Sequence, residues 1–200
     1  MKISKMAAIL SLCLPFSAFA FAATTEELTV TAISPDRDVA TESIADLRAM
    51  GVTGLDALFA KYAADIGRFK KTGQSDDNWK RIAAALDTVA MQKDDYTSQL
   101  FWYTDLDAAR RVAKAQNKPI LSLRLLGNLN EEFSCANSRL FRAILYPNAE
   151  ISKYLTENYI LHWKSVRPAP RITIDFGDGR KIERTITGNS IHYILDSDGN

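Results

Sequence analysis

The spacing of apolar residues changes near residue 100, and this change constrains the fold more than any other feature of the sequence. Between residues 41 and 93 apolar side chains recur at helical spacing, as in the series Leu55, Leu58, Phe59, Tyr62 and Ile66. After residue 100, helical segments alternate with short apolar runs that are typical of strands. The sequence therefore predicts a helical region over 41–100, followed by an α/β domain over 101–200.

The first 22 residues have the pattern of a secretory signal peptide. Lys2 and Lys5 precede an apolar stretch, and small residues at alternate positions predict cleavage between Ala20 and Ala23. An uncleaved N-terminal anchor is the alternative. We expect a periplasmic or secreted protein that has no membrane span after the signal is removed. Cys13 lies inside this segment, so Cys135 is the only cysteine of the mature chain.

The helical region is expected to serve packing rather than chemistry. Residues 23–40 are polar and contain Pro35, so we predict a loose lead-in. One predicted helix carries the Leu55–Ile66 series and ends at Gly73, and another runs from Asp77 to about Gln92. Their apolar stripes indicate a buried core.

The α/β half alternates regularly between helix and strand signals. A helix preceded by Asp105 ends before Lys118-Pro119, and residues 120–126 form an apolar run typical of a buried parallel strand. Helices are predicted after Cys135 and after Asn148, and a second strand over 159–163. This order predicts a parallel strand pair with a right-handed crossover.

The last part of the chain has the pattern of antiparallel structure. Apolar and polar residues alternate over 171–176, and Asp178-Gly179 favours a hairpin turn. We predict an inserted hairpin over 167–187, with a half-buried first strand, and a further strand from Ser190 to Leu195.

From Trp102 onward the sequence resembles the thioredoxin-like superfamily. The resemblance is carried by Lys118-Pro119-Ile120-Leu121, by Cys135-Ala136-Asn137-Ser138 and by the helix and strand that follow. It implies a three-layer α/β domain with the first cysteine of the family's Cys-x-x-Cys motif at Cys135. Ser138 stands at the second cysteine, and Ser190 at the position of the family's cis-proline. The family's closing strand and helix are missing, so we expect an incomplete domain with part of its sheet bare.

Cys135, Ser138, Ser190 and His192 are the candidate site residues. A cysteine at a helix N-terminus is favoured as thiolate, so we expect Cys135 to be partly accessible and acidic, with Glu131 and Glu132 opposing the shift. Ser138 can donate a hydrogen bond to sulfur but cannot resolve a mixed disulfide. A buried, inert cysteine is the alternative. His192, two residues after Ser190, lies on the same strand face and can approach Cys135, where a Cys–His pair could support nucleophilic catalysis. The alternative is a strand histidine that is hydrogen-bonded within the sheet.

Two functions follow from these residues. The first is an exported thioredoxin-fold protein that handles partner thiols through one cysteine, with little dithiol reductase turnover. The alternative is a non-catalytic binding module of the envelope, which would use the inserted hairpin. Without the signal the chain carries 23 basic and 24 acidic residues, so a nucleic-acid partner is not expected. A protein partner is expected, and no cofactor or metal.

Overall fold

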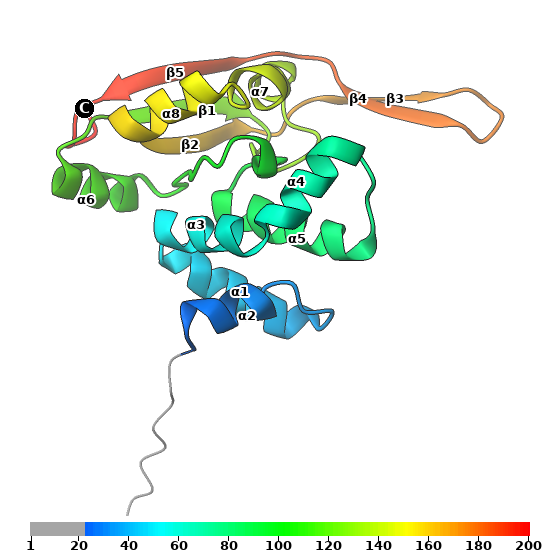
Figure 1. The fold of residues 1–200 in the computed structure, drawn as a ribbon. Helices are drawn as coiled ribbons and strands as arrows, with labels where there is room; N and C mark the ends of the chain where they lie inside the picture. Colours follow the sequence, from blue (N-terminus) through cyan, green and yellow to red (C-terminus); the bar gives the residue numbers. More distant parts are fainter. Residues whose placement is uncertain (1–22) are drawn as a thin grey trace, which may run out of the picture.

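The computed structural model describes residues 23–200 as a mixed α/β molecule with a small sheet (Figure 1). The predicted signal peptide, 1–22, lies outside the described residues. The first half is helical, and its elements are α1 (Thr25–Thr31), α2 (Arg37–Ala49), α3 (Val52–Lys61), α4 (Ala63–Thr72), α5 (Asp77–Ala90) and the short 3-10 helix η1 (Asp95–Thr97). No helix within 23–200 has the length and apolar character needed to cross a membrane.

The predicted loose lead-in over 23–40 is wrong. Thr24 caps α1 through a reciprocal pair of hydrogen bonds with Glu27, and Asp36 caps α2, which begins four residues before the predicted Thr41. Leu28 is buried in the helical core. The polar residues of this segment are helix caps and solvent-facing positions, and they do not prevent helix formation.

The single helix predicted over the Leu55–Ile66 series is two helices. The chain bends at Tyr62, between α3 and α4, and the hydroxyl of Tyr62 donates a 2.8 Å hydrogen bond to the carbonyl of Thr29 in α1. The predicted stripe is still buried in one core with residues of α5. The spacing therefore predicted the buried face correctly and missed the bend.

The second half contains α6 (Leu106–Gln116), β1 (Ile120–Leu126), α7 (Ala136–Leu140), the π-helical turn η2 (Phe141–Leu145), α8 (Ala149–Asn158) and β2 (Ile160–Arg167), followed by β3 (Arg171–Asp175), β4 (Lys181–Thr185) and β5 (Ser190–Leu195). The main sheet has the order β2-β1-β5. Strands β1 and β2 are parallel, as predicted, and β5 pairs antiparallel with β1.

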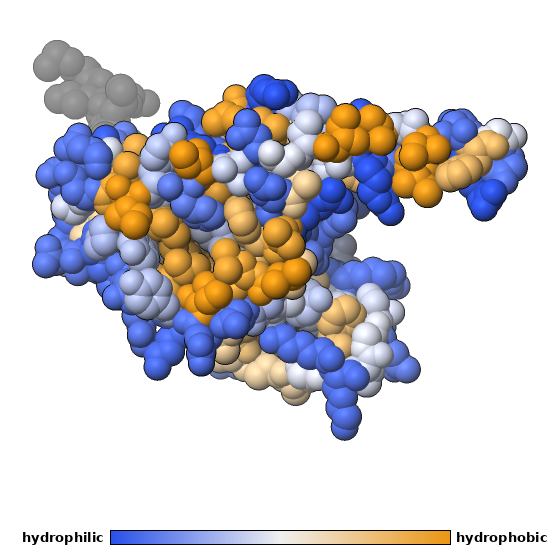
Figure 2. All heavy atoms as spheres, turned by 90° about the horizontal axis from the view of Figure 1, so that it is seen from above, coloured by the Kyte–Doolittle hydropathy of each residue, from blue (hydrophilic) through white to orange (hydrophobic). Residues whose placement is uncertain are grey.

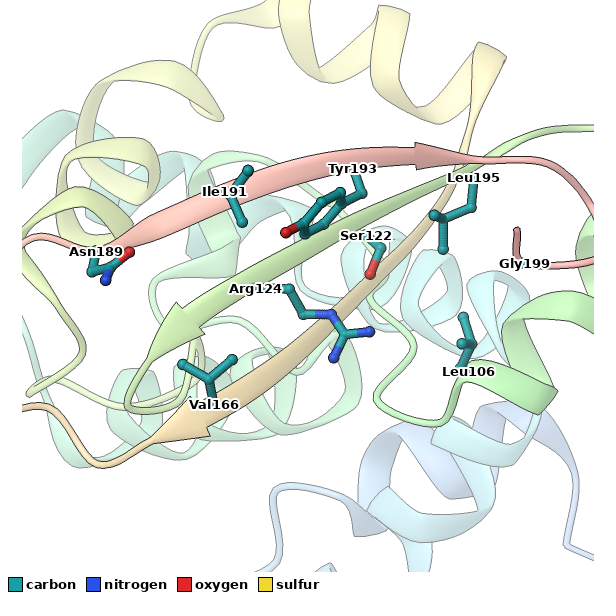
Figure 3. A pocket seen from close by; sticks show the side chains of 9 residues that line it. All are labelled: Leu106, Ser122, Arg124, Val166, Asn189, Ile191, Tyr193, Leu195 and Gly199. Carbon is teal, nitrogen blue, oxygen red and sulfur yellow. The ribbon is translucent and has the colours of Figure 1, made fainter.

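The two faces of this sheet are covered unequally. Leu121, Leu123 and Leu125 of β1 pack in one cluster with Cys135 and residues of η2 and α8. Ile120 points to the other face, where it packs against α6. Helix α6 lies along one end of that face (Figures 1 and 3), and Ile191 and Tyr193 of β5 are exposed on the remainder.

The helical and α/β halves are joined by the segment 91–103. The indole of Trp163 in β2 donates a 2.8 Å hydrogen bond to the carbonyl of Met91, and the indole of Trp102 donates to Gln92. Arg48 of α2 donates to the carbonyl of Trp102. These contacts tie both halves to one segment.

The predicted hairpin is present, but its burial differs from the prediction. Strands β3 and β4 pair only with each other and project from the molecule as an arm, residues 171–185 (Figure 1). The predicted half-buried strand is exposed at every position of β3. Residues with apolar side chains lie along the arm in Figure 2.

Candidate functional site

Cys135 lies at the start of α7, as the sequence predicts. It is the residue before the helix, with φ −62° and ψ 160°, and its carbonyl accepts the first helical hydrogen bond from Arg139. Its own backbone N–H donates to the carbonyl of Leu126, the last residue of β1. The helix start is therefore fixed to the end of the central strand.

The sulfur of Cys135 is surrounded by protein. The residue is 0% exposed, its Sγ lies 3.2 Å from the hydroxyl of Ser138, and it donates to the carbonyl of Asn189 at 3.5 Å. The Ser138 hydroxyl is also 2.9 Å from the carbonyl of Cys135. A hydroxyl has one proton, so Ser138 can donate either to that carbonyl or to the sulfur.

The acidity of Cys135 reflects two opposing influences. Burial raises the pKa of the thiol, and hydrogen bonds from the side chain and backbone of Ser138 lower it, so that the pKa lies below its ordinary value. The lowered pKa agrees with the prediction from the sequence. The predicted partial accessibility is wrong.

A covering segment, residues 185–190, explains why Cys135 is buried. The chain returns from the arm across the start of α7, where the N–H of Ala136 donates to the carbonyl of Thr187. The hydroxyl of Thr185 donates 2.9 Å to the carbonyl of Ser134. Gly188 approaches Asn137 so closely that a Cβ atom there would lie 2.3 Å from the Asn137 amide oxygen.

Ser190 lies close to the helix start, as predicted, but within residues 23–200 it makes no hydrogen bond to the sulfur. Its hydroxyl accepts a 3.2 Å hydrogen bond from the side chain of Asn137, and its neighbour Asn189 supplies the carbonyl that faces Cys135. The peptide bonds within 23–200 are all trans, so Ser190 does not reproduce the cis geometry of the family's proline.

His192 faces the same side of the sheet, yet it is engaged elsewhere. Its Nε2 lies 3.3 Å from the hydroxyl of Tyr146, and its ring packs 5.1 Å from the ring of Phe141, centre to centre. Burial lowers the pKa of His192. Among the hydrogen bonds of residues 23–200, none joins His192 to Cys135, so the structure does not form the Cys–His pair considered from the sequence.

The charged residues near Cys135 bond to the surrounding loop. Arg142 is buried and donates to the carbonyl of Glu131 and the hydroxyl of Ser134, while it pairs with Asp94 at 3.2 Å.

Sequence reasoning did not find Asn137, Asn189 or the covering segment. Gly188 was the available signal, because a glycine beside a site often marks a close backbone approach.

No group of side chains within 23–200 is arranged to bind a metal ion. Comparisons with protein-family models, with curated proteins and with solved structures each found no match.

Proposed function

We propose that the protein is a thioredoxin-like binding module that holds a protein partner through the projecting arm. The thioredoxin-like part of this proposal is supported by topology. Strands β1 and β2 form a parallel pair, and the chain between them contains the helix that starts at Cys135. Strand β5 pairs antiparallel with β1 and begins opposite the start of that helix. The family places its redox motif and its proline at these two points.

The burial of Cys135 favours binding over thiol exchange. Exchange requires a second sulfur to reach Cys135 Sγ directly. Here the sulfur is 0% exposed and lies beneath the covering segment. A partner thiol could therefore react only after residues 185–190 moved away from the start of α7.

The exposed apolar face of the arm is the observation that carries the proposal. Ile172, Ile174 and Phe176 alternate along one face, and Ile174 pairs across the hairpin with Ile182. Ile174 is 46% exposed and Phe176 is 50% exposed. Exposed apolar groups that cluster on a projecting element are typical of protein contact surfaces.

The opposite face of the arm provides a matched control. Thr173 and Asp175 point away from the isoleucines, and Asp175 pairs with Lys181 at 3.1 Å. A partner that buries the apolar face would leave this polar face in water. Because the apolar face makes the contact, the proposal requires an apolar surface on the partner.

Photo-crosslinking in cells that export the protein tests this proposal. A photoreactive phenylalanine at position 174 should give a discrete protein adduct, and the same group at position 173 should not. With the purified partner, Ile174→Asp should weaken binding by about 2 kcal/mol or more, since a charge replaces a buried apolar contact. Thr173→Lys, which places a positive charge opposite Glu183 on the polar face, should leave binding unchanged. Equal adducts from both positions, or none, would reject the proposal.

A thiol role is the second candidate, and the lowered pKa of Cys135 is the observation that favours it. The role requires opening of the covering segment. Because Ser138 cannot release a mixed disulfide, insulin reduction should stay at background in either case.

A further inference from the structure

The sheet face opposite Cys135 contains a hollow of about 500 Å³ between β1, β5 and the start of α6. Its sides are apolar and come mainly from Leu106, Val166, Ile191, Tyr193 and Leu195. Figure 3 shows these side chains around Ser122 and Arg124 of β1. The hollow lies within the size range of sites for small organic ligands, about 300–1,000 Å³.

Arg124 gives this hollow a specific chemistry. It lies on the central strand, where it is in register with Ile191 of β5 and Lys164 of β2. Among the ion pairs and side-chain hydrogen bonds within residues 23–200, none involves Arg124 or Lys164. A guanidinium group offers a planar set of donors that matches a carboxylate.

Lys164 of β2, in register with Arg124, adds a second positive charge to this part of the sheet. Burial lowers the pKa of His162 to about 4, with Arg124 and Lys164 acting in the same direction and Asp105 opposing them. Asp105 is engaged as the cap of α6, where it accepts from the N–H of Ala108. Asp198, near the same end of the sheet, pairs with Lys114. These acids therefore leave Arg124 without a close counter-ion.

We propose that the hollow binds an amphipathic carboxylate, a small molecule with one carboxylate and an apolar chain or ring. The carboxylate pairs with Arg124, with Lys164 contributing long-range attraction. The apolar part covers Ile191, Tyr193 and Leu195, of which Tyr193 is 45% exposed without a ligand. Leu106 closes the end of the hollow at α6 (Figure 3). The site is independent of the arm and of Cys135.

Calorimetric titration with three ten-carbon amphiphiles, below their micelle concentrations, tests the assignment. Decanoate should bind with one-to-one stoichiometry, whereas decanol and decyltrimethylammonium should bind at least about tenfold more weakly, because they cannot form the charge-assisted pair. Amide shifts on adding decanoate should cluster at 122–125 and 191–195. Equal affinity for decanol, or no saturable binding of decanoate, would overturn the proposal.

Substitution of Arg124 separates the site from non-specific adsorption. Arg124→Gln should weaken decanoate binding by about tenfold or more, and Arg124→Lys, which keeps the charge but not the planar donors, should be intermediate. Arg111→Gln, at an exposed position of α6, is the matched control and should bind like the original protein. If Arg124→Gln does not fold, Arg124→Lys decides the question. Unchanged affinity in the Arg124 variants would overturn the proposal.

Discussion

At the scale of single residues, Cys135 shows how position and environment can act in opposite directions. Its place before α7 lowers the pKa through Ser138, which favours reactivity. The covering segment removes the sulfur from solvent, which prevents reaction. Reactivity is therefore determined by how often residues 185–190 leave the helix start, and acidity acts only in the open state.

We predict that Cys135 in the folded protein is protected from alkylation. An opening that costs about 3 kcal/mol slows labelling about a hundredfold relative to the unfolded chain. Gly188→Ala should accelerate labelling, because its Cβ atom would displace the Asn137 side chain that bonds Ser190. Iodoacetamide labelling followed by mass spectrometry measures the rates.

Gly67→Ala is the control for this experiment. Nothing lies within 4 Å of a Cβ atom at position 67, which is inside α4 and distant in sequence from the site. Its labelling rate should match that of the original protein. Fast labelling of the unmodified protein without denaturant would show that the covering segment does not protect Cys135.

At the scale of elements, sequence patterns predicted those whose signals are local. Strand β1 occupies the predicted residues 120–126, and Asn148 caps α8 through hydrogen bonds to the N–H groups of Glu150 and Ile151. Helix α1 was missed because seven residues are too few to show helical periodicity, although its capping box was present. At the bend, Tyr62 makes a contact with Thr29 that no local pattern contains.

The candidate site was predicted in part for the same reason. The helix start after Cys135 follows from the alternation of helix and strand signals, whereas Ser138 and Ser190 were identified through the resemblance to the thioredoxin-like superfamily. The burial of Cys135 depends on where the chain returns from the arm, some fifty residues later. The partner of His192 is likewise a distant residue, Tyr146.

The crossing of α2 and α3 depends on Gly54. A Cβ atom there would lie only 1.9 Å from the backbone carbonyl oxygen of Leu47, so the helices would have to separate. We predict that Gly54→Ala destabilises the protein by about 1–3 kcal/mol, the usual cost of overpacking. Urea unfolding followed by circular dichroism measures this change.

Replacement of glycine by alanine at an open helical position should have the opposite effect on stability. Gly67→Ala should be neutral or stabilise by up to about 1 kcal/mol, because alanine is the better helix former and meets no neighbour. Equal stability of the two variants would show that α2 and α3 adjust their packing without cost.

At the scale of the whole molecule, a buried polar contact joins the two parallel strands of the α/β half. His162 of β2 is 1% exposed, and its Nδ1 lies 2.8 Å from the hydroxyl of Ser122 in β1. Its Nε2 has no hydrogen-bond partner within residues 23–200. The doubly protonated ring would therefore carry a buried Nε2–H without an acceptor and a positive charge near the cationic Arg124 and Lys164.

This arrangement makes global stability depend on pH. Burial lowers the pKa of His162 from 6.5 to about 4 in the folded protein, so between these values the unfolded chain binds more protons. The contribution of neutral His162 to the free energy of unfolding is therefore fully present above about pH 6.5, and it is lost as the pH falls toward 4. The loss amounts to at most about 3.5 kcal/mol, since one pKa unit corresponds to about 1.4 kcal/mol.

We predict that His162→Gln flattens this dependence, because glutamine keeps a polar group beside Ser122 and cannot be protonated. The carboxyls of Asp87 and Asp95, whose pKa values burial raises, act in the opposite direction. The informative quantity is therefore the difference in unfolding free energy between the original and variant proteins, measured by urea titration at several pH values. That difference should shrink as the pH falls from 6.5 to 4. A constant difference would mean that His162 is protonated in the folded state, or that it is exposed to solvent.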